Sequence, residues 1–430
     1  MVERLASWEE PVRLPLHADS RARRLAARWL LPVEAPPLER GAILFDSNGR
    51  IEAIGADAVV PRPTGVPADQ LGDAILIPGL INTHTHLELT GFEGQVGDPE
   101  FSAWIRHLRQ LKTTRGASEY LDAARRGLAD CYATGVTLIA DTGDSGAVIQ
   151  ALSEADGAGV AYQEVFGPDA SKADASLAQL QDDVHRRSRW VTDRVRIGVS
   201  PHAPYTVSGP LYKAVARWAR AEDLPLALHL AESPAEAQFL LAGTGPFADA
   251  WLARDIALPL PVGQTPVRWV ADHDALSEQS LCIHAVQVGP EDIQRLADAG
   301  AAVAHCPVSN RNHGHGAAPL AALLSAGIRV GLGTDSVASV GRLDLLADAR
   351  AARALAGLSA DQVLELCTLG GARALGLDSE TGSLAAGKWG DCTVIRMSEA
   401  AAPPAEQVLA SSPDDVLSTF VGGREVYRAP

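Results

Sequence analysis

The sequence predicts an α/β fold, a (β/α)8 TIM barrel that carries a small β-sandwich built from the N- and C-terminal segments. Three observations favour this fold. Strand-like apolar runs alternate with helical stretches through most of the chain, five of these runs lead into histidine or aspartate, and two further β-like regions lie at opposite ends. A closed barrel brings the ends of strands one, five, six and eight to one rim, whereas an open doubly wound sheet does not.

Eight apolar runs are the expected barrel strands, and each is followed by a helical stretch such as 291–300. The first leads from 75–77 into His84 and His86. The other seven are 136–141, 161–166, 195–200, 226–229, 281–284, 302–305 and 330–335. Eight units of this kind typically occupy roughly 250 residues or more. Residues 77–379 are therefore predicted to form the barrel.

The two end regions, 23–76 and 380–430, are each too small to fold alone. We expect them to pack together as one composite β-sandwich. The first region contains a predicted hairpin over 41–55 around an Asn-Gly turn. The second contains the β-like segments 390–395 and 416–427. Residues 1–22 are charged and aperiodic, and they are expected to form an N-terminal arm.

Composition and charge narrow the classes of partner. The chain has 430 residues, of which 47% are hydrophobic and 21% charged, as in ordinary globular proteins. A formal net charge of −16 argues against nucleic acid or an anionic membrane as a partner. Five scattered cysteines suggest free thiols in a reducing compartment, and no signal peptide or membrane-spanning stretch is evident. We expect a cytoplasmic protein with a small-molecule substrate, and a homodimer is left open.

His84 and His86 are one residue apart at the end of strand one, so both imidazoles point to the same face of the strand. Neutral imidazole is the commonest metal ligand in proteins. His229 from strand five and Asp335 from strand eight complete a candidate N3O set for one divalent metal ion, with an open position for water. Zinc is the expected ion, and iron is the alternative. Each side chain taken singly could be an ordinary core residue, but their recurrence at strand ends favours the metal site.

Glu232 and His284 follow strands five and six, and they are the candidate proton-handling groups. Glu232 is placed to accept the proton of the attacking water. His284, together with Asp335, is expected to hold that water in line. Barrels that bind two metal ions commonly bridge them with a carboxylated lysine on strand four, but 195–200 contains no lysine. We therefore expect a single metal ion.

The chain carries six motifs spread over nearly its whole length, at 78–86, 200–206, 229–232, 305–310, 333–336 and 382–391. Together they resemble the amidohydrolase superfamily in its cytosine deaminase and atrazine chlorohydrolase branch. The resemblance implies zinc or iron at the four ligand positions. It also implies that Glu232 and His284 handle protons and water, and that His202 faces the substrate.

Glu88 and the segments 101–104 and 335–339 are similar to the corresponding parts of aminodeoxyfutalosine deaminases. Those enzymes remove the 6-amino group of a modified adenosine. The resemblance implies hydrolytic deamination of an aminated purine nucleoside or a similar heterocycle, with release of ammonia. The alternatives are a chlorohydrolase or a cyclic amide hydrolase on the same site and, more remotely, a non-catalytic barrel scaffold.

The candidate substrate-binding residues are Glu88, Trp104, His202 and His305. Glu88 would accept hydrogen bonds from a ribose diol or a ring amine, and a salt bridge to an arginine is the alternative. Trp104 would stack on the ring or pack a lid helix, and His305 would line the pocket or only mark a tight strand exit. The candidates for binding a substrate carboxylate are Arg106, Arg109 and Arg311. His313 and His315 depart from the family pattern; they could alter substrate choice or recruit a further metal ion, but we expect them to face solvent.

Overall fold

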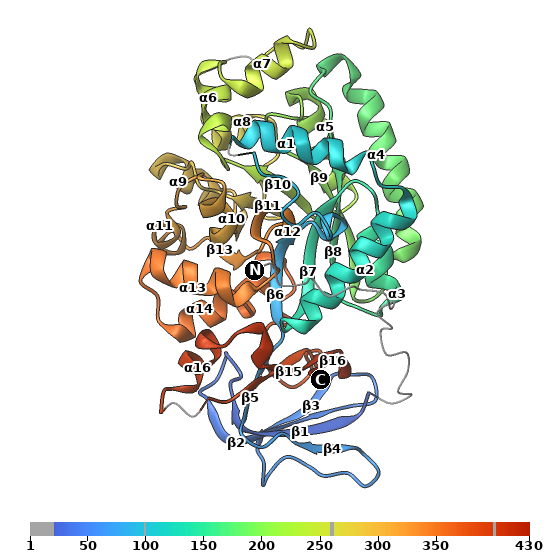
Figure 1. The fold of residues 1–430 in the computed structure, drawn as a ribbon, viewed down its shortest axis with the longest axis vertical. Helices are drawn as coiled ribbons and strands as arrows, with labels where there is room; N and C mark the ends of the chain where they lie inside the picture. Colours follow the sequence, from blue (N-terminus) through green and yellow to red (C-terminus); the bar gives the residue numbers. More distant parts are fainter. Residues whose placement is uncertain (1–20, 99, 259–261, 399–400) are drawn as a thin grey trace, which may run out of the picture.

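The computed structural model describes residues 21–98, 100–258, 262–398 and 401–430, and it contains two β-sheets of eight strands each (Figure 1). One sheet forms a barrel surrounded by helices. The other lies at one end of the barrel and contains the first and last strands of the chain (Figure 1). The arm expected at 1–22 lies outside the described residues except for its last two. Within the described part, every helix is too short or too polar to cross a lipid bilayer.

The barrel strands are parallel and neighbour one another in chain order, so the predicted barrel of eight strands is confirmed, with a later start for the first strand than expected. The strands are β6 (Leu80–Thr85), β7 (Val136–Gly143), β8 (Gly159–Val165), β9 (Val195–Pro201), β10 (Leu226–Leu230), β11 (Ser280–His284), β12 (Ala302–His305) and β13 (Arg329–Leu332). A bridge between Thr85 and Asp335 brings the last strand back beside the first. Strands β10 to β12 are buried along their whole length, as expected for parallel strands covered on both faces.

The apolar run 75–77, predicted to open the barrel, belongs instead to the second sheet. It lies in β5 (Ala74–Pro78), which pairs with β14 (Cys392–Arg396), and the barrel strand β6 begins only at Leu80. The chain crosses between the sheets at Pro78 and Gly79. Proline lacks the N–H that would continue the ladder, and a Cβ on Gly79 would lie 2.0 Å from Thr137 Oγ1. The crossing therefore depends on a proline that ends one strand and a glycine that permits close approach to the barrel.

The second sheet joins both ends of the chain, which confirms that they share one small β structure. Its strands are hydrogen-bonded into a single mixed sheet with β5 and β14 at the junction. The remaining strands are β1 (Arg23–Leu30), β2 (Leu38–Phe45), β3 (Ile51–Ala56), β4 (Ala68–Gln70), β15 (Val416–Val421) and β16 (Arg424–Arg428). The predicted hairpin is formed by β2 and β3. Apolar side chains from both ends, among them Leu25, Phe45 and Phe420, share one core.

Helices form the outer layer of the barrel. They are α2 (Ala117–Ala133), α3 (Ala147–Glu154), α4 (Ala173–Arg187), α5 (Gly209–Ala221), α6 (Pro234–Ala242), α7 (Pro246–Leu252), α8 (Pro266–Asp272), α9 (Pro290–Asp298), α10 (Pro307–Asn312), α11 (Leu320–Ser325), α12 (Val337–Val340), α13 (Leu345–Ala356), α14 (Ala360–Leu366), α15 (Leu369–Ala374) and α16 (Pro404–Ala410), with 3-10 turns η1 (Leu87–Leu89), η2 (Ala170–Lys172), η3 (Ser188–Trp190) and η4 (Pro413–Asp415). One further helix, α1 (Phe101–Lys112), lies across the barrel end that faces away from the second sheet (Figure 1). It therefore lies over the strand ends that carry the candidate site.

Candidate active site

The chain turns sharply where three of the strand ends deliver candidate residues. Ala231, His284 and Asp335 have positive φ angles of 51°, 76° and 65°, in the left-handed region that residues other than glycine rarely adopt. Such backbone strain is found preferentially at functional sites, where the surrounding fold maintains it. These turns lie at the same rim of the barrel. His284, Asp335 and Glu232, which follows Ala231, line one cavity.

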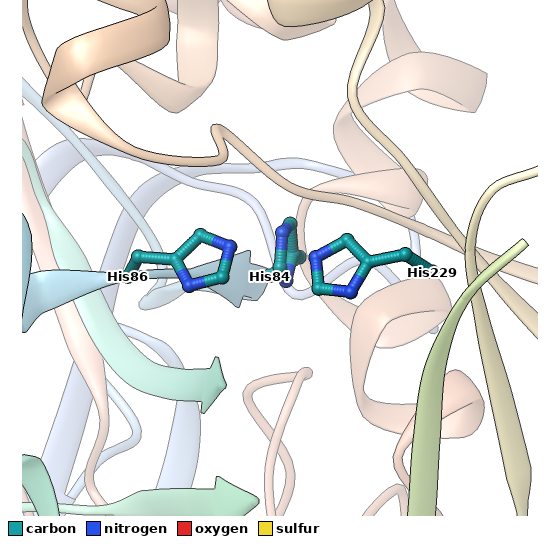
Figure 2. A group of neighbouring side chains, drawn as sticks. All are labelled: His84, His86 and His229. Atoms are coloured by element: carbon teal, nitrogen blue, oxygen red, sulfur yellow. The ribbon is translucent and has the colours of Figure 1, made fainter. Parts of the chain in front are cut away.

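Three imidazoles meet at this rim. The rings of His84, His86 and His229 each offer a nitrogen within 4.8 Å of the others, and Figure 2 shows the ring of His84 lying between the other two. The Nδ1 of His86 donates to the Thr142 carbonyl at 2.8 Å, and the Nδ1 of His229 donates to the His202 carbonyl at 3.2 Å. These bonds leave Nε2 of both rings free to face the common centre, and hydrogen bonds of this kind commonly orient histidines that bind metal ions.

His84 supplies the clearest indication that the centre binds a cation. Both of its ring nitrogens are buried and lack a hydrogen-bond partner among the described residues. Burial lowers the pKa of His84 well below its usual value, so the ring is neutral and able to act as a ligand. A neutral, buried imidazole with no protein partner costs free energy unless another group binds it.

Asp335 adds an oxygen to the three nitrogens. Its Oδ1 lies 3.7 Å from Nε2 of His84 and 3.7 Å from Nε2 of His86. Ser309 Oγ donates to Oδ2 at 2.6 Å, and the Ser336 N–H donates to Oδ1 at 2.6 Å, so the carboxylate is held in place. The donor set of three imidazoles and one carboxylate fits one divalent ion of the zinc type.

A second group of metal-compatible side chains shares His229 with the first. It consists of Glu164, His202 and His229, whose ligand atoms also lie within 4.8 Å of one another. The Nδ1 of His229 is already bonded to a carbonyl, so this ring has one nitrogen to offer and serves one ion. The arrangement therefore fits a single metal ion.

Glu232 lies beside this donor set and is buried. Its Oε1 is 3.5 Å from Nε2 of His284 and 3.4 Å from Nε2 of His315, and Tyr205 donates its hydroxyl to Oε2 at 3.2 Å. Burial opposes ionisation of the carboxyl, but the neighbouring imidazoles outweigh it and hold the pKa of Glu232 well below its usual value. His284 is oriented in turn by Asn310, whose Oδ1 accepts from Nδ1 at 2.9 Å. The structure therefore brings a proton acceptor and a second imidazole to the donor set.

The turn that carries Glu232 is held by a carboxylate that the sequence analysis missed. Glu236 accepts the N–H of Ala231 at 2.9 Å and the N–H of Glu232 at 2.8 Å. Ser233 Oγ caps the same turn by accepting the N–H of Glu236. The Ser-x-x-Glu spacing typical of a helix capping box marks this position in the sequence. This spacing alone does not show that the carboxylate of Glu236 would accept hydrogen bonds from the backbone N–H groups of the turn before the helix.

A cavity of about 450 Å³ opens above the site, within the roughly 300–1,000 Å³ typical of small-molecule pockets. One wall is largely apolar and comes from Phe101, Trp104, Ile105, Leu108 and His313. A polar wall of the cavity comes from Lys112, Asp144, Glu164, His202 and Thr206. Trp104 and His202 line the cavity, and among the three candidate arginines only Arg109 does so.

Glu88 does not line this cavity. Its buried carboxylate binds Lys112 Nζ at 2.7 Å and accepts from the backbone N–H and hydroxyl of Ser145, so the alternative of an ion pair describes it, with lysine in place of arginine. Burial would raise the pKa of Glu88, but Lys112 outweighs it and lowers this pKa to about 2. Lys112 also pairs with Asp144 at 2.7 Å. Glu88 thus holds the ammonium group of Lys112 in place. Lys112, and not Glu88, lines the cavity that a substrate would enter.

We expect Glu88→Ala to destabilise the fold rather than to act on substrate recognition. Removing one partner of a buried ion pair typically costs about 3–5 kcal/mol, and because Lys112 would keep Asp144 we expect a loss of roughly 2–4 kcal/mol in the free energy of unfolding. Urea denaturation would measure it. The double variant with Lys112→Met should lose less than the sum of the two single variants. Unchanged stability combined with weakened nucleoside turnover would instead place Glu88 in substrate binding.

The structure also shows where His305, His313 and His315 lie. His305 is fully buried beneath the site, outside the cavity lining, and neither of its ring nitrogens has a partner among the described residues. The expectation that His313 and His315 face solvent is wrong. His315 is 3% exposed and contacts Glu232, while His313 is half-buried with its ring edge-on to Trp104 at 4.6 Å. The turn after α10 folds inward under α1, which their spacing in the sequence could not show.

The family model for the amidohydrolase family matches residues 75–426, and the chain belongs to this family. The Deinococcus radiodurans aminodeoxyfutalosine deaminase is 33% identical over 326 residues, which cover 72% of this chain and 75% of that protein. The 5-methylthioadenosine/S-adenosylhomocysteine deaminase of Moorella thermoacetica is 30% identical over 420 residues, 92% and 91% of the two chains. A zinc-bound adenosine deaminase structure from Xanthomonas campestris superimposes with a TM-score of 0.80 at 26% identity, covering 94% of this chain and 92% of that one.

Proposed function

We propose that this protein is a mononuclear metal-dependent hydrolase that removes the exocyclic amine of an aminated purine nucleoside or a similar heterocycle and releases ammonia. The observation that carries the proposal is the buried carboxylate of Glu232 facing His284 beside the three-imidazole and Asp335 set. The cavity above it has the size of a small-molecule pocket. The relatives described above, all deaminases of adenosine-type compounds by name, support the same reaction.

His84, His86, His229 and Asp335 would hold the metal ion, with zinc favoured by the Xanthomonas campestris structure and iron as the alternative. A divalent ion there supplies the Lewis acidity that makes water nucleophilic at neutral pH. Glu232 takes a proton from that water and delivers it to the substrate. The oxygen of water bonds to the amine-bearing carbon, the carbon–nitrogen bond breaks, and the proton carried by Glu232 leaves with ammonia.

The remaining side chains hold these groups and the substrate. His284, oriented by Asn310, presents Nε2 beside Glu232 and keeps the water in line. Tyr205 fixes the second carboxylate oxygen of Glu232. Trp104 on the apolar wall offers a face to the heterocycle, and His202 lies on the polar wall. His305 acts below the cavity, as a packing residue.

All the residues that we propose for catalysis and metal binding lie near the ends of barrel strands or shortly after them. We propose the barrel as the catalytic unit, expected at 77–379 and beginning with β6 at Leu80, and the sheet formed from the two ends of the chain as an accessory β unit. The net charge of −16 supports a small-molecule partner and no nucleic acid, and five free, buried cysteines support a reducing cytoplasm. A homodimer remains a prediction, which light scattering on the purified protein would test.

The reaction is tested by a screen with metal-loaded protein against adenosine-type, triazine and pterin compounds. We expect ammonia from adenosine-type compounds. Halide from a chlorinated triazine, or a ring-opened acid from a cyclic amide, would favour the rival hydrolase reactions of the same site. Absence of turnover on every compound in protein that holds one metal ion would favour the scaffold alternative.

A further inference from the structure

Glu164, at the carboxyl end of β8, is a buried acid that the mechanism above does not use. Its side chain lines the cavity, and the residue is only 6% exposed. The Oε1 atom has no hydrogen-bond partner among the described residues. Burial raises the pKa of Glu164 well above its usual value. Buried polar atoms of native proteins are almost always paired, so an unpaired acceptor on a pocket wall indicates that a ligand supplies the donor.

The neighbours of Glu164 are already committed to other partners. Lys112 Nζ is held between Glu88 and Asp144 at 2.7 Å from each. The side-chain amide of Gln163 donates to the backbone carbonyls of Asp144 and Glu164 rather than to the carboxylate. His202 bonds Thr206 Oγ1 through Nδ1 at 2.9 Å. Lys112 keeps one further N–H and His202 keeps Nε2, but no described side chain forms a hydrogen bond with Oε1.

The chemistry of the proposed substrate identifies the donor. In an aminated purine nucleoside the donors are the exocyclic amine and the sugar hydroxyls, because the ring nitrogens only accept. The amine belongs beside Glu232, where it leaves. The hydroxyls remain for a second acid, and Glu88, the acid that the sequence suggested, is bound by Lys112 and Ser145.

We propose that Glu164 binds the sugar hydroxyls of the nucleoside and thereby determines specificity for a ribosylated base over a free one. This inference rests on the proposed function. The polar wall then contacts the sugar while Phe101 and Trp104 contact the apolar face of the substrate. Glu164 acts in binding and takes no part in proton transfer.

The test compares wild type, Glu164→Gln and Glu164→Leu on adenosine and 2′,3′-dideoxyadenosine. Loss of this hydrogen bond should lower kcat/KM on adenosine roughly 10-fold in Glu164→Leu, mainly through KM. Glu164→Gln keeps one acceptor oxygen and should lose less. On the dideoxy compound both variants should remain within about threefold of wild type, because the interaction is absent there. Equal losses on both compounds would overturn the inference.

Two further measurements separate recognition from other roles. Both variants should hold as much metal as wild type, and a loss of metal would make Glu164 a ligand and overturn the proposal. Glu164→Leu should also keep or raise the urea midpoint of unfolding, because it removes a buried acceptor that has no protein partner. A lower midpoint would show a structural role instead.

Asp348→Asn is the matched control. Asp348 is a buried acid on α13 that accepts from the Val308 N–H and lies outside the cavity lining. Its substitution should leave the preference between the two nucleosides unchanged. If wild-type protein deaminates neither compound nor any other adenosine-type compound, the proposed function fails and this inference fails with it. If it deaminates adenosine but the variants do not discriminate, only the inference fails.

Discussion

Glu232→Gln is expected to lower kcat by about 100- to 10,000-fold and to leave the metal content unchanged. Glutamine keeps the size of the side chain and can still accept from Tyr205, but it cannot take up a proton. The three imidazoles and Asp335 are untouched, so the ion should stay. Steady-state ammonia release and elemental analysis of the same preparation would measure both quantities.

The matched control for this prediction is Glu222→Gln. Glu222 is an exposed acid at the end of α5, just before the strand β10 that leads to Glu232, and it lies outside the cavity lining. It should retain wild-type turnover. Normal activity in Glu232→Gln would mean that another group carries the proton, and the two closest candidates are His284 and His315.

His84→Ala is expected to abolish both metal binding and turnover. Wild-type protein should bind about one ion per chain, and the variant should retain only a small fraction of that amount. Three donors would remain, and the cavity left by the ring would be lined by groups that had faced the ion. Elemental analysis after dialysis against metal-free buffer would measure the stoichiometry.

His185→Ala is the control for the metal measurement, because His185 is an exposed histidine on α4 far from the donor set in sequence and outside the cavity lining. It should bind as much metal as wild type. Two ions per chain inside the wild-type barrel would overturn the single-ion assignment. Full metal content in His84→Ala would show that His84 is not a ligand.

The barrel and the donor set could be predicted from the sequence because both depend on local patterns. Apolar runs of strand length between helical stretches determine the β–α order, and the histidine pair at the end of β6 shares one strand face. Closure of the barrel then brings strands far apart in the chain to one rim. The misplaced run 75–77 shows the limit of this reasoning, because an apolar run does not reveal which of two sheets it joins.

The residues that line the cavity were much less predictable from the sequence. Glu88 follows the histidine pair directly, and its position suggested the cavity, but Lys112 from α1 and Ser145 from the turn after β7 bind it. His313 and His315 were expected in solvent and lie under α1 instead. In each case the outcome depends on a partner from a distant segment.

The sequence by itself determined the class of fold, the family and the side chains that we propose to bind metal and to handle protons, because periodicity and strand-end position set them. Only the tertiary structure decided which acid is free to meet a substrate. A carboxylate near the rim binds whichever donor packs closest to it, and that donor comes from another part of the chain. Glu88 has such a donor in Lys112, whereas Oε1 of Glu164 has none among the described residues.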